Sequence, residues 1–291
     1  MVRNDNLVVM QPVREGQLYI VATPIGNLQD ISQRALDVLA AADLVVAEDT
    51  RHSRGLFSHF GLNPPLQAMH DHNEVSVIPA LLERLNAGEQ IAVISDAGTP
   101  LISDPGYRLV RAAHQAGVAV SAVPGPSAVT AALSISGLPT DRFAFEGFLP
   151  ARESARRGAF EGLLHEPRTL VFFETGQRVL ASLETLAAVF GDDREIAVCR
   201  ELTKRFETVL FGPVRLVLGQ VASDADQRRG EFVLVVAGAD RPEPRRQEAI
   251  ELARELAREL PASKAARIAA RITGVPRREL FAALDSGTDS S

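Results

Sequence analysis

Short apolar runs, rich in β-branched residues, alternate with segments of helical period from about residue 18 to residue 236. This alternation constrains the fold more than any other feature, because strands separated by helices favour an α/β domain with a largely parallel sheet. Asp104 is expected to cap a helix that has Pro105 at its first position. The first series predicts buried strands at residues 18–22, 44–46, 91–94 and 118–123, and helices at residues 32–41 and 105–116.

A second series of strands follows a Pro-Gly-Pro break at residues 124–126. Residues 151–158 carry four charges and a glycine, which predicts a mobile connection. The fold class is therefore α/β, with one domain at residues 17–123 and another at residues 124–240. The strands of the second domain are predicted to begin near Phe143 and to include residues 169–173, 195–199, 207–211 and 231–237.

From residue 241 the composition changes to that of a linker, and three short helices are predicted after it. Apolar residues recur at helical spacing over residues 249–260, and again after Ser263, the expected N-cap of the second helix. Gly274 ends that helix, and Pro276 begins a third. Residues 241–291 are thus predicted to form a helical appendage that resembles a helix-turn-helix unit and ends in a polar, frayed tail.

Composition limits the class of protein. Hydrophobic residues make up 46% of the 291 residues and charged residues 23%, as in a globular protein. No apolar run approaches the ~20 residues that span a membrane, and the apolar patch at residues 7–10 is too short for a signal peptide. With Cys199 as the one cysteine no internal disulfide can form, which favours a cytoplasmic location. The net charge of −6 argues, taken alone, against binding of nucleic acid.

Common catalytic and nucleotide-binding motifs are absent from the sequence. It has neither a G-x-G-x-x-G dinucleotide motif nor a phosphate-binding P-loop. His70 and His72 lack a third metal ligand at suitable spacing, so a polar loop is the preferred interpretation and no metal is expected. Ser127 lacks the flanking glycines of a hydrolase nucleophile, and Cys199 is expected to pack within an apolar strand.

Four turns rich in glycine, proline and short polar residues follow predicted strand ends, at residues 23–27, 48–51, 95–106 and 124–128. Ligands of open α/β sheets bind at the carboxyl ends of the strands. Glycine lets the backbone approach a ligand closely, and proline stiffens the turn. One such turn is ordinary punctuation between a strand and a helix. Four of them predict a rigid pocket built mainly from backbone groups, suited to an uncharged heterocycle or a zwitterion.

Longer motifs surround these turns. In the first half they are LYIVATPIGNL at residues 18–28, AEDTR at 47–51, HDHNE at 70–74, SDAGTPLISDPG at 95–106, PGPS at 124–127 and FEGFLP at 145–150. In the second half they are RTLVFFE at residues 168–174, RELTK at 200–204 and GEFVLVV at 230–236. Over about residues 17–284 the chain resembles the tetrapyrrole methylase superfamily and, within it, the methyltransferases of small-subunit ribosomal RNA.

The resemblance implies a two-domain enzyme that binds S-adenosylmethionine in a cleft between the domains. It implies 2′-O-methylation of a cytidine ribose in the decoding region of 16S rRNA, a preference for the assembled small ribosomal subunit over free RNA, and a homodimer. It also implies a set of cofactor-binding residues. These are Pro24, Asp96, Ala97, Gly98, Ile102, Ser103, Ser127, Ala128, Phe173 and Glu201.

Two positions depart from the pattern of the family. Phe173 stands where a tyrosine is expected, and the segment TGQR at residues 175–178 replaces the more usual Ser/Thr-x-His-Arg. Roles of that tyrosine hydroxyl and that histidine therefore do not transfer to this chain.

Methyl transfer to a ribose hydroxyl favours a base or hydrogen-bond acceptor beside the reacting oxygen. Asp49, next to Glu48 at a strand end, and Arg51 form an arrangement that would hold one carboxylate ionised; an ion pair that only stabilises the loop is the alternative. Lys204 is a candidate for binding RNA phosphate, or for a base if burial lowers its pKa. Glu174 is a further catalytic candidate, and the sequence does not choose among them.

The segment from residue 261 to residue 280 is basic, although the chain as a whole is acidic. Five basic residues stand against one acidic residue, a local net charge of +4. They are Lys264, Arg267, Arg271, Arg277 and Arg278. The first three share one helix face, which can neutralise RNA phosphates; an ordinary solvated face is the alternative.

Two other functions stay open. A corrin or other tetrapyrrole methylase would keep the same chemistry, but a small macrocycle gives no reason for the basic appendage. A non-catalytic RNA-binding or ribosome-assembly factor would explain the appendage, but it would not need the four ligand-binding turns.

Overall fold

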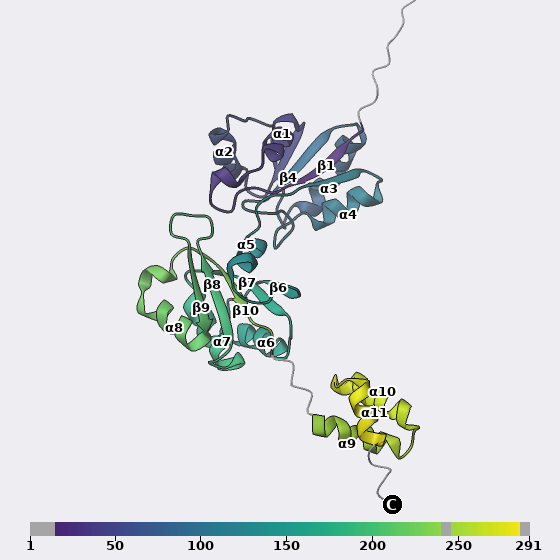
Figure 1. Ribbon diagram of the computed structural model, residues 1–291. Helices are drawn as coiled ribbons and strands as arrows, with labels where there is room; N and C mark the ends of the chain where they lie inside the picture. The colour runs from purple at the N-terminus through teal and green to yellow at the C-terminus, as the bar shows by residue number, and fades with distance from the viewer. Residues whose placement is uncertain (1–14, 240–245, 286–291) are drawn as a thin grey trace, which may run out of the picture. The chain divides into compact units, whose positions relative to one another are not determined.

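The computed structural model describes residues 15–239 and 246–285. The chain divides into two compact units (Figure 1). The larger unit comprises residues up to Leu164 together with Arg168–Ala237, and the smaller comprises His165–Pro167 and the residues from Gly238 onward. The predicted boundary between two α/β domains at residue 123 lies within the larger unit and stays a prediction. The apolar patch at residues 7–10, most of the linker after residue 240 and the tail beyond Asp285 lie outside the described residues.

The first sheet of the larger unit is entirely parallel, as the sequence predicts, with strand order β3-β2-β4-β1-β5. Its strands are β1 (Gln17–Val21), β2 (Leu44–Ala47), β3 (Leu66–Ala68), β4 (Gln90–Ile94) and β5 (Ala119–Val123). The helices that join them are α1 (Gln33–Ala41), α2 (Thr50–His59), α3 (Glu74–Asn86) and α4 (Tyr107–Gln115), with a short 3₁₀ turn, η1 (Leu28–Asp30).

Both faces of this sheet are covered by helices, which explains why its strands are apolar on both sides. Leu18, Ile91 and residues of α3 and α4 form the core on one face. Val21, Val45 and residues of α1 and α2 form the core on the other face. The carboxyl ends of the strands therefore stay uncovered by helices, and the turns emerge there.

The second sheet is mixed, with strand order β6-β7-β10-β8-β9. Only β6 and β7 pair in parallel, and the other three pairs are antiparallel. The chain between β8 and β9 is too short for the crossover that parallel pairing needs, so this sheet cannot repeat the topology of the first. The strands are β6 (Phe143–Phe148), β7 (Thr169–Thr175), β8 (Glu195–Arg200), β9 (Thr208–Pro213) and β10 (Glu231–Val236).

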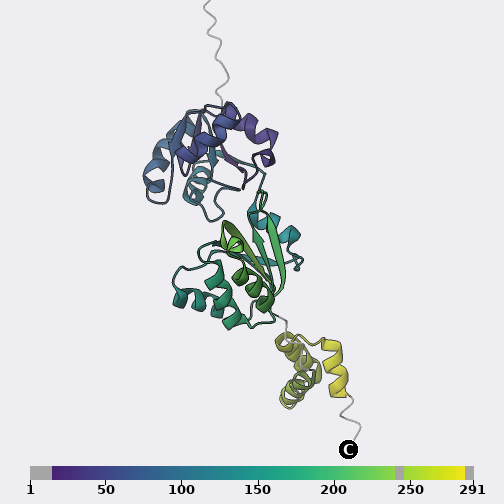
Figure 2. The ribbon, with the colours of Figure 1, turned by 90° about the vertical axis from the view of Figure 1, so that its left-hand side faces the viewer.

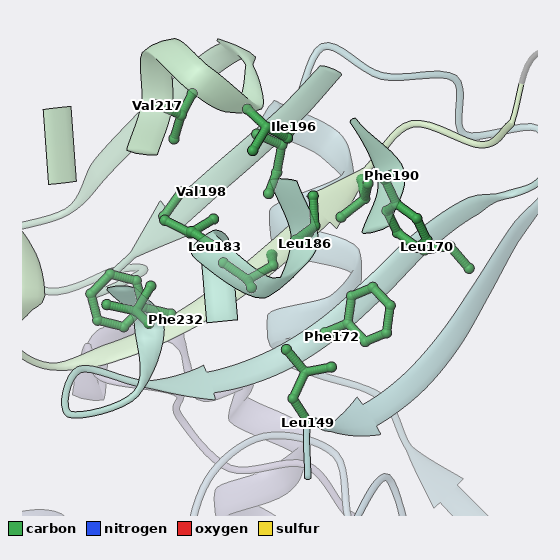
Figure 3. Close-up of a cluster of buried hydrophobic side chains, with 14 of the residues drawn as sticks. Leu149, Leu170, Phe172, Leu183, Leu186, Phe190, Ile196, Val198, Val217 and Phe232 are labelled. Carbon is green, nitrogen blue, oxygen red and sulfur yellow. The ribbon is translucent and has the colours of Figure 1, made fainter. Parts of the chain in front are cut away.

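Helices also cover both faces of the second sheet, so the predicted α/β architecture is confirmed. On one face the core contains Phe160, Phe172, Leu183, Leu186 and Phe232 (Figure 3 shows most of this cluster). On the other face α5 packs on the sheet through residues such as Val129 and Leu133. The helices are α5 (Ala128–Ile135), α6 (Glu153–Gly162), α7 (Val179–Phe190) and α8 (Val214–Ser223), with a second 3₁₀ turn, η2 (Ala225–Arg228).

Residues 151–158 do not form a mobile connection, and that prediction is wrong. They contribute the first turns of α6. Arg156 is only 4% exposed, and its guanidinium donates hydrogen bonds to the Thr185 hydroxyl at 3.1 Å and to the Ala151 carbonyl. Phe160, on the same helix, is fully buried. The four charges suggested an exposed segment, but one of the charged side chains, Arg156, is buried because Thr185 on α7 accepts its hydrogen bond.

The predicted cap of α4 is also wrong, because the helix begins at Tyr107 and Gly106 is its N-cap residue. Glu74, at the start of α3, supplies the cap instead. Its buried Oε1 accepts hydrogen bonds from the backbone N–H groups of Gly106, at 3.2 Å, and Arg108, at 3.0 Å. Gly106 has φ +123°, a conformation that favours glycine. Asp104 is thereby left outside the helix.

The smaller unit contains α9 (Arg246–Ala257), α10 (Ala262–Thr273) and α11 (Arg277–Asp285), the three predicted helices (yellow-green to yellow in Figure 2). Alanine side chains such as Ala253 and Ala269 and the buried Leu280 form a common core. Gly274 ends α10 in the left-handed conformation, as predicted. Ser263 lies inside the first turn rather than at the N-cap, which is Pro261, so the predicted side-chain cap is wrong. No helix of the described segments is long and apolar enough to cross a membrane.

We expect Glu74→Ala to lower the free energy of unfolding by about 1–2 kcal/mol, because two N–H groups at the start of α4 lose their acceptor. Glu83→Ala is the matched control, since Glu83 is an exposed residue of the same helix, and it should change the value by less than about 0.5 kcal/mol. Urea denaturation measures both. Equal effects of the two substitutions would show that Glu74 does not hold α4.

Candidate functional site

A pocket of about 1030 Å³, part of it open to solvent, lies within the larger unit. Its walls come from the turns after β1, β4 and β5 of the first sheet and from β6, β7, β8 and β10 of the second. Three of the four turns that the sequence singled out therefore line it, and the turn at residues 48–51 does not.

The first-sheet side of the pocket is a rigid backbone cradle. Thr23, after β1, and Gly98, after β4, pair in a short antiparallel bridge, with N–H···O=C distances of 2.8 and 3.1 Å. Thr99 donates from its hydroxyl to the Pro126 carbonyl at 3.1 Å, which ties in the turn after β5. Gly98 has φ +81°, and a Cβ atom there would lie 3.2 Å from the Ile25 side chain. Glycine is thus favoured at this position by its conformation, and the Ile25 side chain leaves little space for a Cβ atom.

The segment after this cradle has an unusual backbone. Leu101 and Ser103 have φ values of +72° and +68°, which non-glycine residues adopt only at a cost of about 1–2 kcal/mol each. Between them Ile102 stays 41% exposed and lines the pocket. Such conformations persist where the surrounding structure fixes them, and they concentrate at functional sites.

The second-sheet side of the pocket is mainly apolar. Phe148 and Phe173 line it, and their rings meet edge to face at a centroid distance of 5.4 Å. Cys199 also lines it from β8, and burial raises the pKa of its thiol to about 12. The thiol therefore stays protonated and packs as an apolar group, as the sequence predicts.

Glu174 lies in the pocket wall at the end of β7, but its carboxylate is fully engaged. Oε1 accepts a hydrogen bond from the Thr175 N–H at 2.8 Å and pairs with Arg178 at 2.7 Å. Oε2 accepts one from the Ser182 hydroxyl at 2.6 Å. This buried network fastens the end of β7 to the start of α7.

Lys204 is engaged in a similar way on the loop between β8 and β9. Its Nζ lies 2.9 Å from Glu201 Oε1 and 2.8 Å from Glu231 Oε2. Burial lowers the pKa of Lys204, but the hydrogen bonds to the two carboxylates outweigh burial and raise the pKa above its usual value. The condition under which Lys204 would act as a base, a lowered pKa, is therefore not met. The Thr203 hydroxyl accepts a hydrogen bond from the Asn27 N–H at 3.1 Å, which joins this loop to the turn after β1.

Asp49 caps α2 and forms an ion pair with Arg51. Hydrogen bonds from the Arg51 side chain and backbone hold the pKa of Asp49 at about 2, so this carboxylate is ionised, as predicted. The Arg51 side chain is 86% exposed. Neither residue lines the pocket, although the Asp49 N–H donates to Asp96 Oδ1 at 3.2 Å.

Asp104 was predicted as a helix cap within the pocket-forming turn at residues 95–106, and it lines the pocket without capping the helix. Burial and the negative charges of Glu48, Asp96 and Asp71 together raise the pKa of its carboxyl to about 6, against an opposing hydrogen bond from Ser95. The pKa of Glu48 is raised as well, first by burial and then by its acidic neighbours. Two aspartates in one turn, Asp96 and Asp104, were the sequence signal for an acidic pocket wall. An ordinary turn that ends in a helix cap has the same residue pattern, so the sequence alone could not tell the two apart.

Most of the predicted cofactor residues are brought together. Those that line the pocket are Asp96, Ala97, Gly98, Ile102, Ser103, Ser127, Ala128 and Phe173. Pro24 and Glu201 do not line it. Pro24 adjoins the Thr23 bridge, and Glu201 forms an ion pair with Lys204. Lining residues that the sequence reasoning missed include Thr99, Phe148 and Leu202.

The described residues contain no group of three or more histidine, cysteine or acidic side chains arranged to hold a metal ion. The His70 and His72 rings lie 5.9 Å apart on the loop before α3. In the smaller unit, the side chains of Lys264, Arg267 and Arg271 are exposed on α10, opposite its buried alanines. Arg277 and Arg278, at the start of α11, are exposed too.

Comparison with known proteins places these features in a family. Residues 17–217 match the family described as tetrapyrrole (corrin/porphyrin) methylases, and residues 243–285 match a domain described as the RsmI C-terminal HTH domain. Ribosomal RNA small subunit methyltransferase I of Xylella fastidiosa (strain Temecula1) is 53% identical over 267 residues, which cover 91% of this chain and 98% of that protein. The protein of the same name from Pseudomonas aeruginosa is 54% identical over 228 residues, covering 78% and 81%.

Solved structures show the same fold at low identity. The methyltransferase CobJ has a TM-score of 0.56 at 18% identity, covering 77% of this chain and 95% of that one. A diphthine synthase has a TM-score of 0.56 at 16% identity, covering 76% and 90%.

We expect Gly98→Ala to lower the free energy of unfolding by about 1–2 kcal/mol, because alanine disfavours the positive φ of this turn. Gly158→Ala is the matched control: Gly158 lies on the exposed side of α6 with open space around it, and alanine there should raise stability by about 0.5–1 kcal/mol. Thermal and urea denaturation of both variants test the prediction. A change of the same sign at both sites would contradict it.

Proposed function

The chain belongs to the tetrapyrrole (corrin/porphyrin) methylase family and is a methyltransferase by descent, and we propose that its substrate is the RNA of the small ribosomal subunit. In detail, the proposed reaction is the transfer of a methyl group from S-adenosylmethionine to the 2′-oxygen of a cytidine ribose in the decoding region of 16S rRNA. The observation that carries the choice of substrate is the basic, three-helix C-terminal unit.

The residues of the pocket fit S-adenosylmethionine. The backbone of Asp96 and Ala97 offers polar groups beside Gly98, whose own N–H and C=O pair with Thr23 and whose lack of a side chain permits close approach. Phe148 and Phe173 offer an apolar wall for a heterocycle. Ile102, Ser103, Ser127 and Ala128 complete the proposed contacts, and Pro24 and Glu201 support them from adjoining positions. When bound, the cofactor supplies a methyl group on a positively charged sulfur.

The charged residues predicted to be catalytic are proposed to build the frame of the site. Glu174 holds the end of β7 and the start of α7, so it fixes Phe173 in the wall. Lys204 holds Glu201 and Glu231 and stays charged, so a contact with RNA phosphate suits it better than proton transfer. Asp49 orients Arg51, whose exposed guanidinium is proposed to contact the RNA backbone.

The C-terminal unit favours RNA over a macrocycle. The proposed RNA contacts are the exposed basic side chains of α10 and α11, namely Lys264, Arg267, Arg271, Arg277 and Arg278. Basic side chains that share a face neutralise phosphates and release counterions. The Xylella fastidiosa relative, which matches over 91% of this chain, carries the name of a ribosomal RNA methyltransferase, whereas the low-identity structural relatives support only the fold.

Location and assembly follow from the same proposal. A small ribosomal subunit as substrate places the enzyme in the cytoplasm.

We propose a homodimer, for which Phe211, exposed on the edge strand β9, and Leu216, exposed on α8, offer apolar surface.

Tritiated S-adenosylmethionine, incubated with three acceptors, tests the reaction. The acceptors are small subunits lacking the modification, naked 16S rRNA and a corrin precursor. We expect label in the small subunits, retained on ribose after nuclease digestion, and little in naked RNA. Label only in the corrin would refute the RNA substrate, and label in none would refute methyl transfer to either class.

Charge reversal tests the RNA surface. Arg267→Glu combined with Arg271→Glu should weaken RNA binding and reduce the slope of log K against log salt by at least about 1.4, because two phosphate contacts are lost. Arg254→Glu with Arg258→Glu makes the same change of charge at two exposed positions, one on α9 and one just after it, and is the matched control. Filter binding across a salt series measures both. Equal losses in the two double variants would show only a general charge effect.

A further inference from the structure

The loop between β8 and β9, residues 201–207, presents an aromatic ring to solvent. Phe206 is 61% exposed, and the guanidinium carbon of Arg205 lies over its ring, 5.4 Å from the centroid. Aromatic rings and guanidinium planes are the surfaces on which proteins stack unpaired RNA bases. A single exposed aromatic side chain is ordinary on a protein surface. Phe206 differs from that ordinary case in its rigid support and in its place beside the pocket.

Hydrogen bonds on both sides of Phe206 hold the backbone of the loop. The Phe206 carbonyl accepts them from the Arg200 guanidinium at 3.2 Å and from the Thr208 hydroxyl at 3.0 Å. The Glu207 carboxylate accepts another from the Thr203 N–H. Thr203 itself has φ +64°, a conformation that persists only where its surroundings fix it. A ring carried by such a loop loses little conformational entropy when it binds a partner.

The same loop borders the pocket. Leu202 lines the pocket, and Phe206 follows it by four residues, so their Cα atoms lie within about 14 Å of each other. The loop also meets the turn after β1, because a Cβ atom at Gly26 would lie only 2.5 Å from Lys204 Cγ. The ring is therefore fixed close to the pocket from both sheets.

The charges of the loop favour a nucleic acid as its partner. Lys204 pairs with Glu201 and Glu231, and Glu207 is directed toward the loop backbone. Arg205 is exposed and forms no ion pair with any residue in the described part of the chain. An unpaired cation beside an exposed ring suits a base and its phosphate. An apolar protein partner would instead bury the charge of Arg205 without a counter-charge, which is costly.

We propose that Phe206 and Arg205 form a stacking platform for an unpaired RNA base that neighbours the methylated nucleotide. The inference rests on the proposed function and adds a recognition element to it. A nucleotide that enters a pocket leaves the stack of its neighbours, so the adjacent base loses a stacking partner. The Phe206 ring replaces that partner, and Arg205 neutralises a phosphate of the same strand.

Steady-state kinetics with unmodified small ribosomal subunits test the platform. Phe206→Ala should raise KM by about 5–150-fold, the range that alanine substitution gives for base–aromatic stacking. It should change kcat less than threefold, because the stack is present in both the bound substrate and the transition state. Phe206→Trp keeps a flat ring and should keep KM within threefold of wild type. Phe206→Leu keeps apolar bulk without a ring and should resemble Phe206→Ala.

Salt dependence separates the two members of the platform. Arg205→Ala should reduce the slope of log K against log salt by about 0.7, because one phosphate contact of a single strand is lost. Phe206→Ala should leave the slope unchanged, since stacking releases no counterions. Filter binding of the small subunits across a salt series measures both slopes.

Phe143→Ala is the matched control. Phe143 is also an exposed phenylalanine that follows an exposed arginine, Arg142, but it begins β6, whose other end at Phe148 lines the pocket. It should change neither KM nor the salt slope. Calorimetric binding of S-adenosylhomocysteine should change less than threefold in every variant.

Other outcomes overturn the inference. A rise in KM of less than fivefold in Phe206→Ala would overturn it and leave the proposed function intact. An equal loss in Phe206→Trp or in Phe143→Ala would show that stacking at this loop is not the cause. A loss that accompanies conversion of a dimer to a monomer in sedimentation would assign Phe206 to a contact between subunits. Absence of ribose methylation by the wild type would refute the proposed function, and this inference with it.

Discussion

The backbone bridge between Thr23 and Gly98 is the constraint on which the site depends. β1 and β4 are parallel neighbours, so the chain leaves both strands at the same edge of the sheet. For the two turns to pair antiparallel there, one must reverse direction sharply, and Gly98 does so with φ +81°. The reversal orients the following segment toward the pocket and brings Thr99 to the Pro126 carbonyl. The first-sheet side of the pocket is therefore set by main-chain geometry.

Side-chain charges play a different part, because most of those around the pocket neutralise one another. Glu174 pairs with Arg178, and Lys204 pairs with Glu201 and Glu231. These pairs hold strand ends and loops in place and leave an interior of backbone and apolar groups. Such an interior suits a ligand with little net charge, which agrees with the expectation from the glycine- and proline-rich turns. The acidic neighbours Glu48, Asp96 and Asp104 are the exception, since burial and nearby negative charge raise the pKa values of Glu48 and Asp104.

Features that depend on periodicity and on strand ends could be predicted from the sequence. The parallel first sheet, the carboxyl-end turns and the three C-terminal helices all agree with the structure. Two of the errors share a different cause, because each assigned a polar residue a local role that a distant partner decides. Arg156 is buried by its bond to Thr185, and α4 is capped by Glu74 rather than by Asp104. Caps and buried charges need the fold before their partners can be known.

The net charge of −6 misleads for a related physical reason, since it averages over parts with opposite electrostatic tasks. The carboxylates gathered around Asp104, whose charges add to burial in raising its pKa, create a local field that repels phosphates, so the pocket is a poor place to capture a polyanion. A basic surface on a separate small unit, such as that of α10 and α11, can bind the RNA phosphates instead. An acidic pocket needs only one nucleotide, whose ribose and base carry no charge. An acidic total is thus compatible with an RNA substrate when binding and chemistry are assigned to different parts of the chain.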